Sequence, residues 1–140
     1  NKGWGMKHFP AFLACETYGN RVLDGDGIPT NAYGWQHPLA APNSSSGWFL
    51  PSCGQLTYLA NNRSFLEAHM EIVKDNTPDE NSYKEYIKGF EEEKAYWSST
   101  EYTDEYPNSP EFARILHFFN GYDSRDVKGN SHNVRAVLAF

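Results

Sequence analysis

Apolar residues recur at helical spacing in several stretches of the first two thirds of the chain. The first predicted helix begins at Pro10, which suits the first helical position, and Gly19 ends it. Three more helices are predicted where a serine is followed three residues later by Glu or Gln, the pattern of a capping box. These pairs are Ser52 with Gln55, Ser64 with Glu67, and Ser82 with Glu85.

Each of the three later helices carries apolar positions at intervals of three or four residues, by which it would pack against the rest of the domain. These positions are Leu56, Leu59 and Ala60 in the first, Leu66, Met70 and Val73 in the second, and Tyr83, Tyr86, Ile87 and Phe90 in the third. Residues 20–46 show no lasting period and are rich in Gly, Pro, Asn and Ser, which predicts a long surface loop. The short apolar run 47–51 predicts a strand ended by proline.

From Tyr96 onward the apolar period changes to two, which is typical of strands. Residues 112–119 are predicted to form a strand, Asn120-Gly121 a hairpin turn, and residues 122–128 the returning strand. A second turn at Gly129-Asn130 would lead into a last strand over residues 134–140. Helices followed by an antiparallel meander predict an α+β fold, in one domain spanning residues 1–140.

Composition narrows the classes of function. The net charge is −6 and no cluster of Lys and Arg occurs, which argues against nucleic acid as a partner. No apolar run approaches the length of a membrane span, so we expect no direct membrane insertion by this domain. Aromatic residues make up 16% of the chain, and many tyrosines have polar neighbours, which favours a recognition surface. Cys15 and Cys53 lie in apolar helical patterns and are interpreted as two buried free thiols, with a single disulfide as the alternative.

Four blocks of the sequence resemble a bacterial family of C-type-lectin-fold domains. The blocks are residues 47–52 with Gln55-Leu56, residues 96–102, residues 113–118 with Gly121, and residues 134–140. Members of this family are common as terminal domains of surface lipoproteins and pilus-like proteins of gut bacteria, and close relatives are variable proteins diversified by retroelements. The resemblance implies a C-type-lectin-like fold with helices packed on a twisted antiparallel sheet, an extracellular or cell-surface location, and a C-terminal place in a longer chain.

The resemblance also implies roles for particular residues. Trp97 would be a core residue beside the sheet, the hydroxyls of Ser98, Ser99 and Thr100 would tie backbone corners, and Tyr102 would lead into a displayed segment. In the diversified relatives the segment before the last strand carries the ligand-contacting positions, which here are residues 103–133. Arg114 stands where the family commonly has Trp.

Alternation along the predicted strand 112–119 then indicates a binding face. If Leu116 and Phe118 face the core, then Ile115, His117 and Phe119 face outward, and such a row on a small domain is typical of an interface. The alternative is that helices or the 20–46 loop cover this side too. Neighbouring loops add Tyr, Asn, Ser and Asp, the residue types of antibody-like binding surfaces. The candidate ligand-binding residues are Tyr102, Asp104, Glu105, Tyr106, Asn108, Arg114, Ile115, His117, Phe119, Tyr122, Asp123, Ser124, Arg125 and Asp126.

Motifs for other chemistry are weak. No His or Cys pair has the spacing of a zinc site, and residues 24–27 offer two carboxylates for calcium but lack the other ligands of an EF-hand loop. No nucleophile elbow, phosphate-binding loop or HExxH motif occurs. We therefore expect no catalytic residues, no metal and no cofactor. The predicted function is recognition of a protein or glycan ligand, and the alternative is a structural or docking module of a bacterial surface or pilus-like assembly.

Overall fold

The computed structural model describes residues 9–16, 18, 21–23, 29–31, 41–42, 44–81, 84, 87–102 and 111–140. The chain forms two compact units. The first comprises Asn1–Pro51 and Val134–Phe140, and the second comprises Ser52–Asn133. The assignment of residues 1–140 to one domain stays a prediction. Among the helices that the structure describes, none combines the length and the apolar character needed to cross a membrane.

The first unit contains one helix and one short hairpin. Helix α1 (Pro10–Glu16) begins at the predicted proline, and its Cys15 is fully buried. Strands β1 (Arg21–Leu23) and β2 (Pro29–Asn31) pair antiparallel. The expectation of an irregular loop over residues 20–46 is therefore wrong for these two segments.

The last residues of the chain do not form the predicted strand. Phe49 and Val137 exchange two backbone hydrogen bonds of 3.0 Å, and Ser46 donates a third to the carbonyl of Ala139 at 2.8 Å. The pairing of residues 134–140 with this segment is thus an isolated antiparallel bridge at Val137. Residues 134–140 have a high β propensity, but a strand also needs a neighbouring strand to pair with along its whole length, and propensity does not provide one.

Helix α2 (Cys53–Asn61) opens the second unit and starts where its sequence predicts. The Ser52 hydroxyl accepts a hydrogen bond from the Gln55 backbone N–H at 3.2 Å, and the Ser52 backbone N–H donates to the Gln55 side chain at 2.8 Å. This is a complete capping box, which satisfies two N–H groups that a helix start leaves without partners.

Helix α3 (Arg63–Asp75) follows at once, but the capping box predicted from Ser64 and Glu67 is wrong. Its first cap residue is Asn62, whose side chain makes no capping bond. Glu67 instead accepts a hydrogen bond from the backbone N–H of Phe90 at 3.0 Å and lies 3.8 Å from Arg63. A long-range partner has therefore taken the carboxylate that the local pattern assigned to the helix start.

One predicted apolar position of α3 does not pack as expected. Val73 of α3 has 56% of its surface exposed, whereas Leu66 and Met70 pack against the core. The third predicted helix lies partly outside the described residues, which omit Ser82, Tyr83, Glu85 and Tyr86. Its remaining apolar positions, Ile87 and Phe90, are not helical, so the prediction is wrong there.

The sheet of the second unit is the predicted antiparallel meander. Strands β3 (Ala95–Glu101), β4 (Phe112–His117) and β5 (Tyr122–Val127) lie in the order β3-β4-β5. Gly121 has a φ of 66°, the left-handed conformation that a tight hairpin turn requires. Sequence and structure agree that this unit has an α+β architecture.

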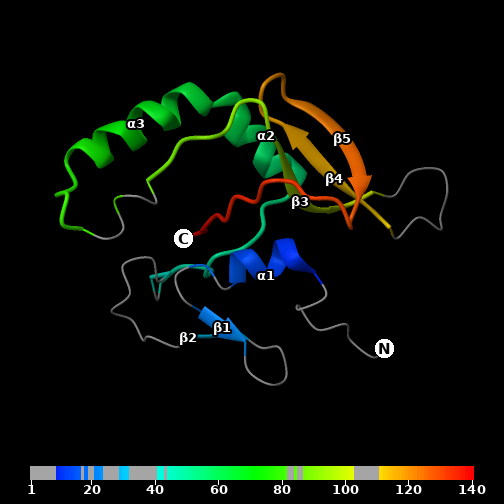
Figure 1. The fold of residues 1–140 in the computed structure, drawn as a ribbon, viewed down its shortest axis with the longest axis horizontal. Helices are drawn as coiled ribbons and strands as arrows, with labels where there is room; N and C mark the ends of the chain where they lie inside the picture. Colours follow the sequence, from blue (N-terminus) through cyan, green and yellow to red (C-terminus); the bar gives the residue numbers. More distant parts are fainter. Residues whose placement is uncertain are drawn as a thin grey trace. The chain divides into compact units, whose positions relative to one another are not determined.

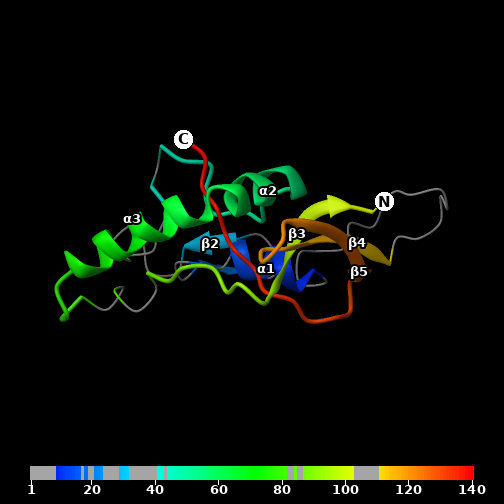
Figure 2. The ribbon, with the colours of Figure 1, turned by 90° about the horizontal axis from the view of Figure 1, so that it is seen from above.

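The core of the second unit lies between α2 and the sheet, and Figures 1 and 2 show α2 against the strands while α3 extends away from them. Phe90 and Phe118 stack with ring centroids 4.7 Å apart. The Tyr96 hydroxyl accepts a hydrogen bond from the Glu91 backbone N–H at 2.9 Å, so its polar end is satisfied. The buried core residues are Leu56, Phe90, Tyr96, Leu116 and Phe118.

The hydroxyls of the 98–100 block tie the backbone of the same unit, as expected. Ser98 donates from its hydroxyl to the carbonyl of Arg114 at 2.9 Å, and Thr100 accepts a hydrogen bond from the Cys53 backbone N–H at 2.9 Å. Trp97 is buried. The block therefore fixes β3 to both β4 and the start of α2.

Candidate functional site

Strand β4 does not present the predicted outward row. Leu116 and Phe118 are buried as expected, but Ile115 is only 4% exposed and His117 is half-buried. Ile115 lies directly opposite Trp97 of β3, and residues paired in this way share one face of a sheet. The prediction that Ile115 faces water is wrong, because β4 is buried on both faces at this point.

The hairpin formed by β4, β5 and their turn separates the predicted binding residues into two groups. Arg114 pairs with Arg125, and Leu116 with Asp123, so these lie on the face that carries the core. Ser124 lies opposite Ile115 on the other face. The residues on this other face are Ile115, His117, Tyr122, Ser124 and Asp126.

On the core-bearing face, beyond the edge of the core, five residues form what we call the arginine cluster. Its members are Tyr102, Phe112, Arg114, Asp123 and Arg125. The guanidinium carbons of Arg125 and Arg114 lie 4.5 Å and 5.4 Å from the centroid of the Tyr102 ring, and that of Arg125 lies 5.2 Å from the centroid of Phe112. Arg114 forms an ion pair with Asp123 at 2.6 Å. The structure thus brings together four of the predicted site residues, with Phe112 as an addition.

Cys53 at the start of α2 adjoins this cluster. Burial raises the pKa of its thiol, and the negative charge of Asp123 raises it further. Both Cys53 and Cys15 are buried, as the sequence predicts. A raised pKa keeps Cys53 in the protonated, weakly nucleophilic form at neutral pH.

On the opposite face, Asp126 is held by three hydrogen bonds. His132 Nε2 lies 2.6 Å from one of its carboxylate oxygens, and the backbone N–H of Val127 and the side-chain amide of Asn130 donate to the other at 2.7 Å and 2.8 Å. The hydrogen bond with His132 is the main cause that lowers the pKa of Asp126, followed by that from Val127. The His132 ring also contacts Trp97 edge to face at 4.9 Å.

His132 was not among the predicted site residues. The signal that places it near Asp126 is the turn at Gly129-Asn130, which reverses the chain between the two. Asp126 makes three hydrogen bonds with residues at or just after this turn, so its carboxylate helps to hold the turn together.

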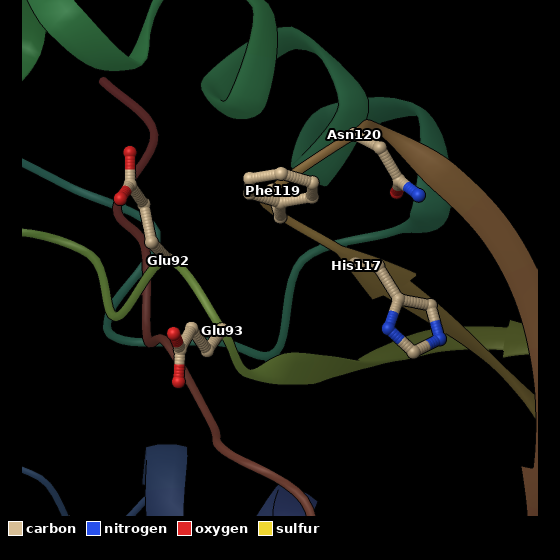
Figure 3. Close-up of a pocket in the computed structure, with 5 residues that line it drawn as sticks. All are labelled: Glu92, Glu93, His117, Phe119 and Asn120. Carbon is tan, nitrogen blue, oxygen red and sulfur yellow. The ribbon is translucent and has the colours of Figure 1, made fainter.

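An open recess of about 330 Å³ lies at the turn end of the hairpin. Figure 3 shows Glu92 and Glu93 on the segment before β3 at one side, and His117, Phe119 and Asn120 at the other. Glu92 forms an ion pair with Arg63. Sequence reasoning did not find Glu92 and Glu93 as site residues, because nothing local shows that the chain folds back beside the hairpin.

Phe119 lies in this turn and Tyr122 follows it, and they are the most exposed aromatic residues of the hairpin, at 73% and 62%. The Tyr122 ring lies 6.2 Å from the ring of His117. Asn120 fixes the turn, since its side-chain oxygen accepts a hydrogen bond from the Tyr122 backbone N–H at 2.9 Å. Two predicted ligand-contacting aromatics are thus displayed on a turn with defined hydrogen bonding.

The structure separates Glu101 and Tyr102 from His117, so these polar residues do not line one pocket. Glu101 lies opposite Ala113 at one end of β4, and His117 is at the other end. Glu101 forms an ion pair with Lys128 at 2.7 Å. The recess contains His117 and neither of the other two.

Several predicted positions lie outside the described residues. They are the predicted binding residues Asp104, Glu105, Tyr106 and Asn108, and the calcium candidates Asp24 and Asp26. Within the part of the chain that the structure does describe, no group of three or more His, Cys, Asp or Glu residues could hold a metal ion.

Comparison with known proteins gives no relative: no family model matches the chain, and no significant match occurs among the curated proteins or the solved structures.

Proposed function

We propose that the chain is a non-catalytic recognition domain that binds a protein or glycan ligand through the turn end of the β4–β5 hairpin. We propose further that it has a C-type-lectin-like fold, acts at a bacterial cell surface, and is related to diversified variable proteins. The four sequence blocks described above support the second proposal. The first is supported by the geometry of the hairpin.

One observation carries the binding proposal. Phe119 and Tyr122 are largely exposed, while the residue just before Phe119, Phe118, is buried in the core and stacked on Phe90. Aromatic side chains supply a large contact area with few torsions to immobilise, and they are enriched at sites that dominate binding energy. Buried Phe118 and the hydrogen bond to the Asn120 side chain hold the backbone around Phe119 and Tyr122 in position, so binding would cost little conformational entropy.

The recess beside Phe119 adds polar groups to this aromatic surface. Glu93, His117 and the side-chain amide of Asn120 line it, and together they offer both donors and acceptors. A site with an aromatic wall and a few directed polar groups fits a side chain of a protein or a sugar ring.

The test is a screen of the whole chain on glycan and protein arrays, followed by the double variant Phe119→Ser with Tyr122→Ser. We expect the double variant to lose capture of any ligand found, with an unchanged melting temperature because both side chains are exposed. Phe65→Ser is the matched control, since Phe65 is 65% exposed but lies on α3. Equal capture by the double variant and the wild type would refute the proposed site.

A second candidate function is the structural or docking module. It is favoured by α3, where Phe65, Ile72 and Val73 are exposed within the described part of the chain. A row of this kind would suit a neighbouring domain of a surface assembly. Sedimentation of the isolated chain distinguishes the two functions: the docking module self-associates, and Ile72→Ser with Val73→Ser prevents this, whereas the recognition domain stays monomeric.

A further inference from the structure

Arg125 differs from the other arginines of the second unit because aromatic rings contact its guanidinium and no acid among the described residues pairs with it. Its guanidinium carbon lies 4.5 Å from the Tyr102 ring centroid and 5.2 Å from that of Phe112. Arg63 and Arg114 have acid partners, whereas Arg125 forms no ion pair with the residues that the structure describes. Its five N–H donors are therefore oriented by stacking and available to an incoming acceptor.

The residue opposite Arg125 adds a second positive charge. Arg114 is its direct cross-strand partner, and like charges in this position destabilise a sheet. Asp123 neutralises one of the two guanidinium groups, so among the described residues the arginine cluster keeps one uncompensated positive charge, in a chain of net charge −6. An anion bound beside Arg125 would reduce the remaining repulsion between Arg125 and Arg114, which Asp123 offsets only in part.

We propose that Arg125, assisted by Arg114 and Tyr102, binds a carboxylate carried by an Asp or Glu side chain of a peptide partner. The planar guanidinium fork matches the two oxygens of a carboxylate, and such bonds are among the stronger hydrogen bonds in proteins. This inference rests on the proposed recognition function and names the chemical class of one part of the partner.

The position of Arg125 favours a peptide over other carriers of a carboxylate. Strand β5 is an outer strand of its three-strand sheet, pairing with β4 on one side. The backbone groups of an outer strand can pair with an extended peptide, which would bring an acidic side chain beside Arg125. The overall negative charge of the chain opposes an acidic ligand at long range, but salt screens this effect over about 8 Å at physiological ionic strength.

The experiment is an NMR titration of the whole chain, following the side-chain Nε–H signal of Arg125 and the backbone amides of residues 112–114 and 123–127. The probe is the blocked tripeptide Gly-Asp-Gly, with Gly-Asn-Gly as its neutral isostere. We expect saturable shifts at these signals with the Asp peptide only. Arg125→Gln should weaken binding about tenfold or more, and Arg125→Lys should weaken it less, because the charge remains but the fork is lost.

Lys88→Gln is the matched control, since it changes the net charge equally and leaves the arginine cluster intact. Equal shifts with the Asn peptide, no saturable shift, or undiminished binding by Arg125→Gln would overturn the inference. Inorganic phosphate and glucuronate are titrated in parallel, and binding of either without binding of the Asp peptide overturns the assignment to a peptide.

These results separate the inference from the function on which it rests. If the arrays reveal a ligand that requires Phe119 and Tyr122 while the Asp peptide leaves Arg125 undisturbed, the recognition function stands and the carboxylate site fails. If the Asp peptide binds at Arg125 and the array ligand is unaffected by the Phe119 and Tyr122 changes, the carboxylate site stands and the turn-end site fails.

Discussion

At the scale of single residues, Ile115 and Phe119 show why alternation is not the same as exposure. Both belong to the predicted outward row, yet Ile115 is buried beside Trp97 and Phe119 lies in the turn after β4. The period of two predicts on which face a side chain lies. It does not predict whether another part of the chain covers that face, and this information is not local.

Truncation of these two residues should therefore have different effects. We expect Ile115→Ala to lower the free energy of unfolding by about 2–5 kcal/mol, because it removes buried methyl groups and leaves a cavity. Phe119→Ala should change it by less than about 0.5 kcal/mol. Urea denaturation of both variants measures the difference. A small effect for Ile115→Ala would indicate that Ile115 faces water after all.

Asp126 gives a residue-scale prediction about pH. Its pKa is lowered in the folded chain, so the folded state holds a proton at this carboxyl less readily than the unfolded state does. The resulting stabilisation is present above the unfolded pKa of about 3.9 and is lost as the pH falls through the lowered folded value.

In His132→Ala the pKa of Asp126 should move back toward its ordinary value, because the largest cause of its lowering is removed. Titration of the Asp126 carboxyl carbon by NMR checks this directly. The acid side of the stability profile should also become shallower in Asp126→Asn than in the wild type. An unchanged pKa in His132→Ala would show that the hydrogen bond from the backbone of Val127 is sufficient by itself.

At the scale of elements, a local sequence pattern predicts the structure correctly where no distant residue forms hydrogen bonds with the same side chains. The Ser52–Gln55 box forms as predicted. The β4–β5 hairpin also forms, but β4 ends at His117 and not at Phe119, so the turn spans residues 118–121. The pattern at Ser64 and Glu67 is the same in sequence, but Glu67 binds the backbone of Phe90. Long-range hydrogen bonds of this kind override capping patterns and cannot be found from spacing.

Substitution of the two serines tests this distinction. Ser52→Ala should cost about 1 kcal/mol of stability, because the hydroxyl satisfies a backbone N–H at the start of α2. Ser64→Ala should be neutral or slightly stabilising, since Ser64 lies inside α3, where alanine has the higher helix propensity. Equal losses in both variants, measured by thermal or urea unfolding, would contradict the observed caps.

At the scale of the whole molecule, the candidate site depends on a unit with its own core. Both the arginine cluster and the turn-end recess belong to Ser52–Asn133, and so do the buried residues Leu56, Tyr96, Leu116 and Phe118. The sequence predicts α2, α3 and the β4–β5 hairpin of this unit, but it also predicts helix at Ile87 and Phe90, which is absent there. It does not predict that the chain as a whole divides into two compact units. Residues 134–140 belong to the first unit, in which Val137 pairs with Phe49, a residue far from it in sequence.

A fragment of residues 52–133 should consequently fold without the rest of the chain. It retains α2, α3, the three-strand sheet and the core between them, which is what an independently folding unit requires. Trp97 is the sole tryptophan in this fragment, so its fluorescence reports on folding without interference. We expect blue-shifted emission that moves to longer wavelength in one cooperative urea transition, together with the same binding at Arg125 as the whole chain. Emission typical of exposed tryptophan in the absence of urea would mean that the second unit needs the first in order to fold, and that the binding experiments must be made on the whole chain alone.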